Sequence, residues 1–229
     1  MFLRRWEELN DDLKNDEVKY YYDLLSNKKF DIILKRVFDF TLSFILLLLL
    51  SPILIFLSLL VKATSSGPIL YKQERVTTYG KTFNILKFRT MVKDADKIGE
   101  LVTLSNDDRI TKIGGFLRKT RLDELPQLLN IIAGQMSFVG TRPEVQKYVN
   151  YYTDRMKATL LLPAGVTSLA SITFKDESNK LISQESASEI YINEILPIKM
   201  QFNIEYLEKF NLIYDLKLII KTVIAVINK

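Results

Sequence analysis

An adjacent acid pair, Asp123-Glu124, is the feature of this sequence best suited to chemistry. Arg118 and Arg121 precede the pair, and a helix is predicted to begin just after it. Nearby cations and a helix N-terminus both favour the ionised form of a carboxyl group. An ionised aspartate can attack phosphorus to form an acyl phosphate, while the second carboxylate could hold magnesium or move a proton. Adjacent acids at a helix start also serve as ordinary caps, so the local sequence leaves both interpretations open.

Two basic clusters could contact an anionic substrate. In the stretch SFVGTRPEV, Arg142 and Pro143 follow a glycine turn, which could present a rigid guanidinium to a phosphate or a uracil ring. In KFRTM, Lys87 and Arg89 lie on one face at the end of a predicted strand, where they could contact a pyrophosphate or a lipid phosphate. A solvated arginine in a surface turn is the alternative for the first cluster, and the second is a weak signal by itself.

The composition limits which chemistry these residues can support. The 229-residue chain has no cysteine and no histidine. Disulfides, thiolate zinc sites and cysteine nucleophiles are therefore excluded, as is catalysis by histidine. Any metal is expected to be a hard ion such as magnesium. The net charge of +5 and the pI near 9.1 suit an anionic partner. No nucleic acid is predicted as that partner, because the basic residues are interleaved with acids rather than gathered in a stripe.

An uncharged apolar run extends from Phe40 to Val61. Its roughly 22 residues would form about 33 Å of helix, enough to cross the hydrocarbon core of a bilayer. A buried helix of this length in a soluble protein would normally show a polar face, which this run lacks. Membrane insertion is therefore predicted.

Ser51-Pro52 interrupts the apolar run near its middle. Proline removes a backbone donor and clashes with the preceding turn, so a kink is expected, and Ser51 could satisfy the freed carbonyl. Two halves of about eleven residues would each reach roughly 16 Å, about half the hydrocarbon core. Basic residues flank both ends of the run, with Lys35 and Arg36 before it, so both ends look cytosolic. This geometry fits a hairpin that enters and returns, and a kinked spanning helix is the alternative.

The rest of the chain is predicted to form a compact, mostly helical α+β domain with a small β-hairpin. Residues 64–68 are rich in turn formers, and the alternating segments 69–76 and 81–90 predict the hairpin. Helices are predicted at 92–102, within 114–134 and at 214–229. The second helix is expected to be led by Pro126 and to stop at Gly134. The last helix is amphipathic, so it could lie in a membrane interface or pack on the core.

Several motifs, taken in order, resemble those of the bacterial sugar transferase family, the monotopic phosphoglycosyl transferases. The motifs are KRVFDF, a leucine-rich run broken by SP, GPILYKQERV, FNILKFRTM, LRKTRLDELPQLLN, MSFVGTRPE and YDLKLIIKTV. The resemblance covers about residues 32–229. It implies a polar N-terminal extension at 1–31, a re-entrant membrane helix at 32–62 and a cytosolic catalytic domain at 63–229 with interfacial amphipathic helices.

Members of this family transfer a sugar-1-phosphate from a nucleotide sugar, usually a UDP-sugar, to a polyprenol phosphate, and they release UMP and require Mg²⁺. The resemblance therefore implies an enzyme of the bacterial cytoplasmic membrane that contacts inner-membrane lipid, with its active site on the cytosolic face. Undecaprenyl phosphate is the expected acceptor, and surface-glycan assembly is the expected pathway. The sugar and the oligomeric state are left open, a homo-oligomer included.

The resemblance also assigns roles to individual residues. Asp123 would be the nucleophile of a two-step covalent reaction, and Glu124 would assist it at the magnesium site. Arg142 and Pro143 match the nucleotide-side motif, in which Thr141 replaces the usual first proline. The remaining basic residues expected to bind substrate are Lys87, Arg89, Arg118 and Arg121.

The membrane motif is expected to be built from five residues. Lys35 and Arg36 would meet lipid headgroups, Asp39 would help fix the helix angle, and Ser51 and Pro52 match the break of a re-entrant helix. The resemblance thus favours re-entry over spanning.

Two other functions remain open from the sequence. The first is a membrane-attached glycosyltransferase that moves a bare sugar and releases UDP. The second is a non-catalytic, membrane-anchored component of a polysaccharide assembly complex. A further departure from the family pattern, the block PAGVTSLASITFKDE at 163–177, is interpreted as a subfamily mark that contacts the sugar.

Overall fold

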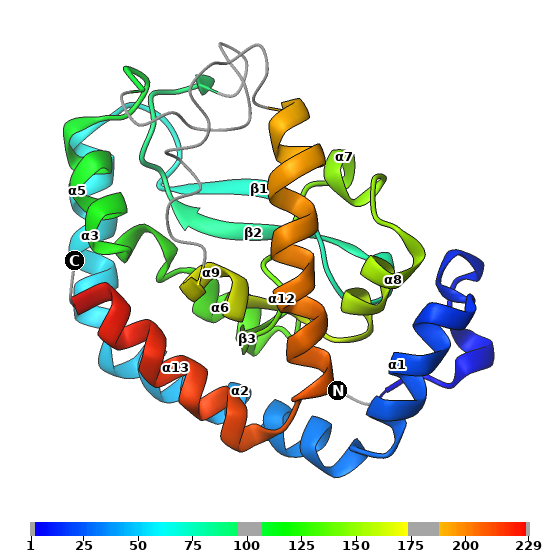
Figure 1. The fold of residues 1–229 in the computed structure, drawn as a ribbon. Helices are drawn as coiled ribbons and strands as arrows, with labels where there is room; N and C mark the ends of the chain where they lie inside the picture. Colours follow the sequence, from blue (N-terminus) through cyan, green and yellow to red (C-terminus); the bar gives the residue numbers. More distant parts are fainter. Residues whose placement is uncertain (1–2, 96–106, 174–187, 228–229) are drawn as a thin grey trace.

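The computed structural model describes residues 3–95, 107–173 and 188–227 (Figure 1). Within these residues, two small two-stranded sheets are surrounded by helices. The predicted α+β class with mostly helical content is confirmed. The helix predicted at 92–102 falls largely on residues 96–106, which lie outside the described residues.

The N-terminal segment consists of two short 3-10 turns and a helix, η1 (Trp6–Glu8), η2 (Asp11–Leu13) and α1 (Asp16–Ser26). Asn15 caps α1, because its side chain accepts a hydrogen bond from the backbone N–H of Val18 at 2.9 Å. The apolar side chains of the segment are buried in the main hydrophobic core, which they share with the rest of the chain. The expected polar extension therefore packs against the domain that follows it.

Helices α2 (Lys29–Leu49) and α3 (Ser51–Thr64) contain the apolar run and meet at a bend of 64°. Pro52 has no N–H to donate to the carbonyl of Leu48, and the hydroxyl of Ser51 donates to that carbonyl instead, at 2.8 Å. The predicted kink and the predicted role of Ser51 are confirmed. Among the described residues, no single helix is both long and apolar enough to cross a bilayer, whereas α2 and α3 together meet that requirement by length and composition.

The predicted hairpin is present as strands β1 (Leu70–Val76) and β2 (Thr82–Phe88), which pair antiparallel. Their turn contains two consecutive residues with positive φ, Tyr79 at 60° and Gly80 at 73°. Phe83 and Ile85 on the buried side of β2 form a small core with residues of the helix that follows the acid pair. The hairpin is thereby fixed against that helix.

The acid pair lies between helices α5 (Lys112–Thr120) and α6 (Gln127–Ile132), in the 3-10 turn η4 (Leu122–Glu124). Gly114 lets α5 approach the preceding chain closely, because a Cβ at this position would lie 1.9 Å from the carbonyl oxygen of Thr90. Pro126 immediately precedes α6, and Gly134 follows it with a φ of 76°, so the predicted start and stop of this helix are confirmed.

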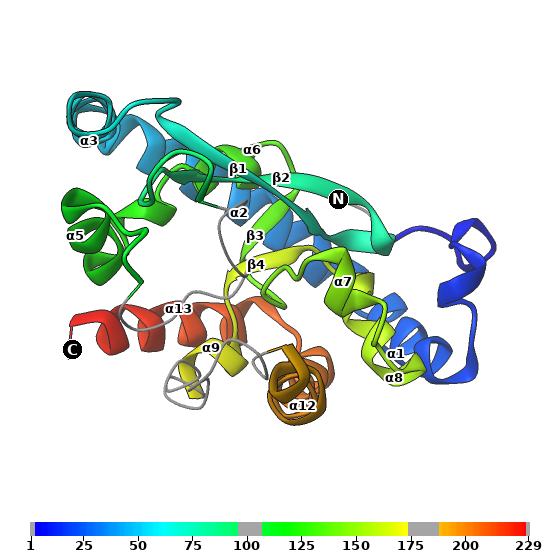
Figure 2. The same ribbon diagram turned by 90° about the horizontal axis from the view of Figure 1, so that it is seen from above.

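A second sheet, which the sequence analysis did not predict, pairs β3 (Met136–Val139) parallel to β4 (Ala164–Thr167). The elements between these strands are α7 (Gln146–Val149), α8 (Asp154–Lys157) and η5 (Ala158–Leu161). After β4 come α9 (Leu169–Thr173), the π-helical turn η6 (Tyr191–Ile195), α12 (Leu196–Glu208) and α13 (Leu212–Ile227). Figure 2 shows the hairpin on one side of β3 and β4, with α12 and α13 on the other.

Helix α13 confirms the predicted C-terminal helix, and one of its faces packs on the core, whereas its location in a membrane interface stays a prediction. Leu218 is fully buried against the core. Ile213 and Ile220 point outward and are 67% and 59% exposed. Helices α2 and α3 are similarly apolar on their exposed sides, where Leu49 and Leu59 are 69% and 65% exposed. All three helices therefore carry an apolar surface with no protein partner among the described residues.

Candidate active site

Asp123 and Glu124 occupy the short turn η4 between two helices. Arg121 ends α5 in the left-handed region, with a φ of 60°, and so redirects the chain into this turn. The Asp123 side chain is buried, with the residue only 7% exposed. The acids therefore lie at a helix break, and among the described residues no side-chain hydrogen bond caps η4 or α6.

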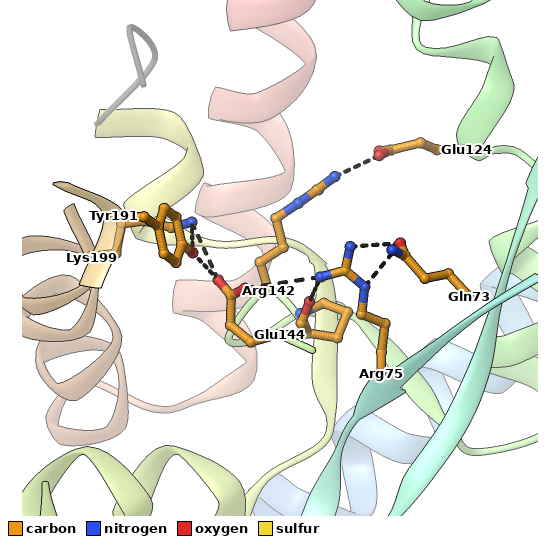
Figure 3. Close-up of polar contacts among 8 residues, drawn as sticks. Gln73, Arg75, Glu124, Arg142, Glu144, Tyr191 and Lys199 are labelled. Atoms are coloured by element: carbon orange, nitrogen blue, oxygen red, sulfur yellow. Dashed lines mark hydrogen bonds and ion pairs between the residues drawn. The ribbon is translucent and has the colours of Figure 1, made fainter. Parts of the chain in front are cut away.

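Glu124 is held by two cations from distant parts of the chain. Its Oε1 lies 3.0 Å from Nζ of Lys87, on β2, and 2.6 Å from Nη2 of Arg142, in the loop after β3 (Figure 3 shows the second pair). Burial raises the pKa of Glu124, but Arg142 and Lys87 more than offset it, so the pKa lies well below its usual range. Glu124 is thus ionised at neutral pH. Of the two roles open to it, holding a cation is favoured over moving a proton.

The environment of Asp123 differs from the sequence expectation. Burial raises the pKa of Asp123 and the negative charge of Glu124 raises it further, while Lys87, Arg118 and Arg121 lower it only in part. The net pKa is above its ordinary value, because desolvation of the carboxylate outweighs the cations around it. A cation bound beside Asp123 would lower this pKa and so favour the ionised form. Arg118 is half-buried and Arg121 is exposed, and both act on Asp123 through their charges.

The Arg142 loop is fixed by the parallel strand pair. The carbonyl of Thr141 accepts a hydrogen bond from the N–H of Gly165 at 2.8 Å, and Arg142 Nη1 donates to the carbonyl of Val166 at 3.3 Å. Both partners belong to the block at 163–177. This block supplies β4 and orients Arg142, while its last residues, from 174 on, lie outside the described residues. Thr141 stands where the family usually has a proline. It makes its contact with Gly165 through the backbone carbonyl, which a proline would also provide.

Arg89 contacts the segment that follows α3 rather than the acid pair. It is only 6% exposed, and its guanidinium donates to the carbonyl of Ser65 at 2.6 Å and to the carbonyl of Pro68. These carbonyls belong to the segment just beyond α3, so Arg89 ties this segment to the end of β2. Substrate binding by Arg89 stays a prediction, whereas Lys87, on the same predicted strand face, reaches the acid pair.

Lys35 is also placed differently from the expectation that it meets lipid headgroups. It is only 4% exposed, and its Nζ lies 2.5 Å from Oδ2 of Asp215, 2.9 Å from the carbonyl of Val139 and 3.9 Å from Asp39. Asp39 accepts a hydrogen bond from the N–H of Phe138 at 3.2 Å. The ammonium is buried because two buried acids and a carbonyl surround it. Lys35 and Asp39 thus hold α2 against β3 and α13.

Arg36 contacts the helix that follows the acid pair. Its guanidinium donates to the last carbonyls of α6, those of Ile131 and Ile132, at 2.6 and 2.8 Å. A cation at this end of a helix satisfies free carbonyls and complements the helix dipole. The contact of Arg36 with lipid headgroups stays a prediction.

A second buried network, which the sequence analysis did not identify, adjoins Arg142. Glu144 is 7% exposed and contacts Arg75, Tyr191 and Lys199 (Figure 3). The only signal in the sequence was the position of Glu144 directly after the Arg-Pro pair. Its three partners come from segments far away in the chain, so no local pattern could reveal them.

The acid pair offers a magnesium ion two hard carboxylate groups. In the part of the chain that the structure describes, no cluster of three or more acidic, histidine or cysteine side chains is present. Magnesium usually keeps several waters and binds through one or two carboxylates together with substrate phosphates. Asp123 and Glu124 fit that requirement, because they place two carboxylates side by side in one short turn.

The chain is similar to several known proteins. The family model described as bacterial sugar transferase matches residues 30–229. The UDP-glucose:undecaprenyl-phosphate glucose-1-phosphate transferase of Escherichia coli (strain K12) is 35% identical over 196 residues, which are 83% of this chain but only 39% of that protein. The uncharacterized sugar transferase EpsL of Bacillus subtilis (strain 168) is 34% identical and is covered over 86% of its length, against 84% of this chain. The exopolysaccharide production protein ExoY of Sinorhizobium fredii (strain NBRC 101917 / NGR234) is 33% identical, with 84% of each chain covered.

Proposed function

The chain belongs to the bacterial sugar transferase family, and we propose that it is a phosphoglycosyl transferase that moves a sugar-1-phosphate from a UDP-sugar to a membrane polyprenol phosphate. The products are a polyprenyl-diphospho-sugar and UMP. Undecaprenyl phosphate is the proposed acceptor, because the Escherichia coli relative is named for it. A role in surface-glycan assembly is supported by the relative named as an exopolysaccharide production protein.

One observation supports this proposal most directly. The buried Asp123 is followed by Glu124, whose carboxylate contacts two cationic side chains. Lys87 and Arg142 hold Glu124 ionised beside Asp123. Phosphoryl transfer depends mainly on positioning and on neutralising charge, which this cluster provides without histidine. Arg118 and Arg121 add positive charge around Asp123 that could meet the phosphates of the donor.

Asp123 is proposed as the nucleophile of the first half-reaction and as the leaving group of the second. In the first, a carboxylate oxygen of Asp123 forms a bond to the phosphorus that carries the sugar, and the bond from that phosphorus to the UMP oxygen breaks, so UMP leaves with the electron pair. In the second, an oxygen of the polyprenol phosphate attacks the same phosphorus. The acyl-phosphate bond breaks, and the Asp123 carboxylate is restored.

Asp123 and Glu124 are also the proposed ligands of magnesium. The ion would neutralise negative charge on the donor phosphates when it is bound. Glu124 is suited to this role because its pKa lies well below its usual range, so it offers a charge and no proton at neutral pH. Arg142 is proposed to bind the nucleotide side of the donor from the same cluster.

The proposed location is the cytoplasmic membrane, with α2 and α3 entering the bilayer and returning to the cytosolic face. The 64° bend, the proline break and the exposed apolar side chains of both helices support this proposal. Re-entry would place the acid pair near the interface, where a water-soluble nucleotide sugar and a lipid phosphate can both reach it.

Nucleotide release tests the proposal directly. Purified protein, magnesium and undecaprenyl phosphate are offered a panel of UDP-sugars, and UMP and UDP are quantified separately. Lipid-dependent UMP is the expected product, and the active donor identifies the sugar. Lipid-dependent UDP would instead establish a glycosyltransferase that moves a bare sugar. Full function of the Asp123→Ala protein in cells would point to the non-catalytic component of an assembly complex.

A further inference from the structure

Glu144 is a buried acid two residues after Arg142, and it has no role in the reaction proposed above. The hydroxyl of Tyr191 donates to Oε1 of Glu144, and Nζ of Lys199 lies 3.4 Å from the same oxygen. On the other side, Nη1 of Arg75 lies 3.9 Å from Oε2 (Figure 3). The carboxylate is therefore held between strand β1 and the helical unit formed by η6 and α12.

Tyr191 is itself fixed within this cluster. Nζ of Lys199 donates to the Tyr191 hydroxyl at 2.9 Å and lies 5.0 Å from the centre of its ring. The ring packs against Tyr148, with 4.5 Å between ring centroids. Because the ring and the hydroxyl are both constrained, the position of the Glu144 carboxylate is defined by η6 and α12 rather than by solvent.

The backbone between Glu144 and Arg142 has little freedom to absorb a displacement. Pro143 has a nearly fixed φ, and Arg142, as the residue before a proline, is restricted to extended conformations. The segment is also tied to β1, because the carbonyl of Pro143 accepts from Arg75 at 3.3 Å and the carbonyl of Glu144 accepts from the N–H of Val76 at 2.9 Å. The position of Glu144 is therefore coupled to that of Arg142 through a short and conformationally restricted segment.

We propose that Tyr191 and Lys199 are positioning residues, which act on the reaction by holding Glu144 and thereby setting the place from which Arg142 reaches Glu124. The guanidinium of Arg142 lies 2.6 Å from Glu124 at the far end of this chain of contacts. The effect on turnover rests on the proposed function, in which Arg142 binds the donor. The link from α12 to Arg142 is a matter of geometry and can be measured without turnover.

A double-mutant cycle tests the effect on the reaction. Tyr191→Phe removes one hydroxyl and keeps the ring, so folding is retained. It is expected to lower kcat/KM for the UDP-sugar roughly tenfold, the usual order for losing a hydrogen bond to a charged group. In an Arg142→Met background, the same change is expected to have no further effect, because the residue through which it acts is absent.

Tyr206→Phe is the matched control for this cycle. Tyr206 is a buried tyrosine of α12 whose hydroxyl donates to another acid, Asp215, at 2.8 Å. Any effect of Tyr206→Phe is expected to be the same with and without Arg142. Wild-type kcat/KM in Tyr191→Phe, or an effect of Tyr191→Phe that persists unchanged in the Arg142→Met background, would overturn the inference.

A second readout separates this inference from the proposed function. The Nε–Hε signal of Arg142 is assigned in ¹⁵N spectra of the full chain in detergent by its loss in Arg142→Lys. Tyr191→Phe is expected to shift or broaden this signal, whereas Tyr206→Phe is expected to leave it in place. An unchanged signal in Tyr191→Phe overturns the positioning role. Absence of UMP from the wild-type protein would refute the proposed function alone.

Discussion

Lys35 and Asp215, which are 180 residues apart in the sequence, form a buried ion pair with 2.5 Å between Nζ and Oδ2. The pair joins the first long helix of the chain to the last one. Asp39 and the hydroxyl of Tyr206 complete the cluster, since Asp39 lies 3.9 Å from Lys35 and Tyr206 donates to Asp215. One ammonium group thus offsets two buried carboxylates.

Lys35→Met should strongly destabilise the protein. It leaves Asp39 and Asp215 buried without their cation, and breaking a buried pair in this way typically costs about 3–5 kcal/mol. Thermal unfolding in detergent solution measures the loss, with Lys217→Met, an exposed lysine on α13, as the control. Adding Asp215→Asn to Lys35→Met should recover part of the stability. Equal stability of the two lysine variants would refute the structural role of Lys35.

Asp123→Asn should abolish lipid-dependent UMP release, by at least about a thousandfold, because an amide cannot form the acyl phosphate. The variant should remain folded and bound to membranes, since the side chain keeps its size. Asp108→Asn, which changes a nearby exposed acid, serves as the control and should leave UMP release intact. Wild-type turnover by Asp123→Asn would exclude Asp123 as the nucleophile.

The pH dependence of turnover should report the ionisation of Asp123. Its pKa is raised by burial and by Glu124, and Arg118 is among the cations that oppose this rise. Removing that cation in Arg118→Met disfavours the carboxylate, so the pKa rises further. The acid limb of kcat/KM should therefore move to higher pH.

Lys119→Met provides the control for this shift, because Lys119 is the exposed neighbour of Arg118. Its pH profile should coincide with that of the wild type. A shift of the acid limb to lower pH in Arg118→Met would contradict the electrostatic assignment.

Arg89→Met should separate stability from catalysis. The change removes the donors to the carbonyls of Ser65 and Pro68, so the free energy of unfolding should fall by about 1–3 kcal/mol. The KM for the donor should stay the same. Lys87→Met should show the opposite pattern, with reduced turnover, because Lys87 holds Glu124 at 3.0 Å. A raised KM for the donor in Arg89→Met would instead show that Arg89 contributes to substrate binding.

Single cysteines can establish whether α2 and α3 re-enter the cytosolic face, because the chain has no cysteine of its own. Asn27→Cys and Ser66→Cys place thiols before α2 and after α3, at exposed positions. A membrane-impermeant reagent should label neither site in intact cells and both sites after permeabilisation. Labelling of one site in intact cells would indicate a spanning helix.

Local patterns were sufficient to predict several elements. Alternation of apolar side chains predicted the hairpin, and Pro126 with Gly134 defined the helix after the acid pair. The Ser51-Pro52 break was also predictable, since both the missing donor and its replacement lie within one turn of helix. In each case the residues that determine the structure are neighbours in the sequence.

Long-range contacts explain what the sequence analysis missed. Strands β3 and β4 are short, and their parallel pairing depends on segments separated by several helices. Arg89 and Lys35 looked like ligands for phosphate or lipid because a basic side chain alone does not reveal its partner. Their partners, Pro68 and Asp215 among them, are brought close only by the tertiary fold. The same reason kept Tyr191 and Lys199 out of the predicted site.

The N-terminal segment has a consequence for engineering chimaeras between relatives. Residues before 30 lie outside the stretch that matches the family, yet Leu13 and Leu25 are buried in the main core. The segment also contacts the hairpin turn and α8. The N–H of Arg4 donates to the hydroxyl of Tyr79 in the turn, and Nε of Arg155 in α8 donates to the hydroxyl of Tyr21. The match to the family begins at residue 30, but the hydrophobic core includes residues on both sides of that position. If only residues 30–229 were exchanged, the apolar surface against which the N-terminal segment packs would no longer match it. The segment and the residues that it contacts should therefore be exchanged together.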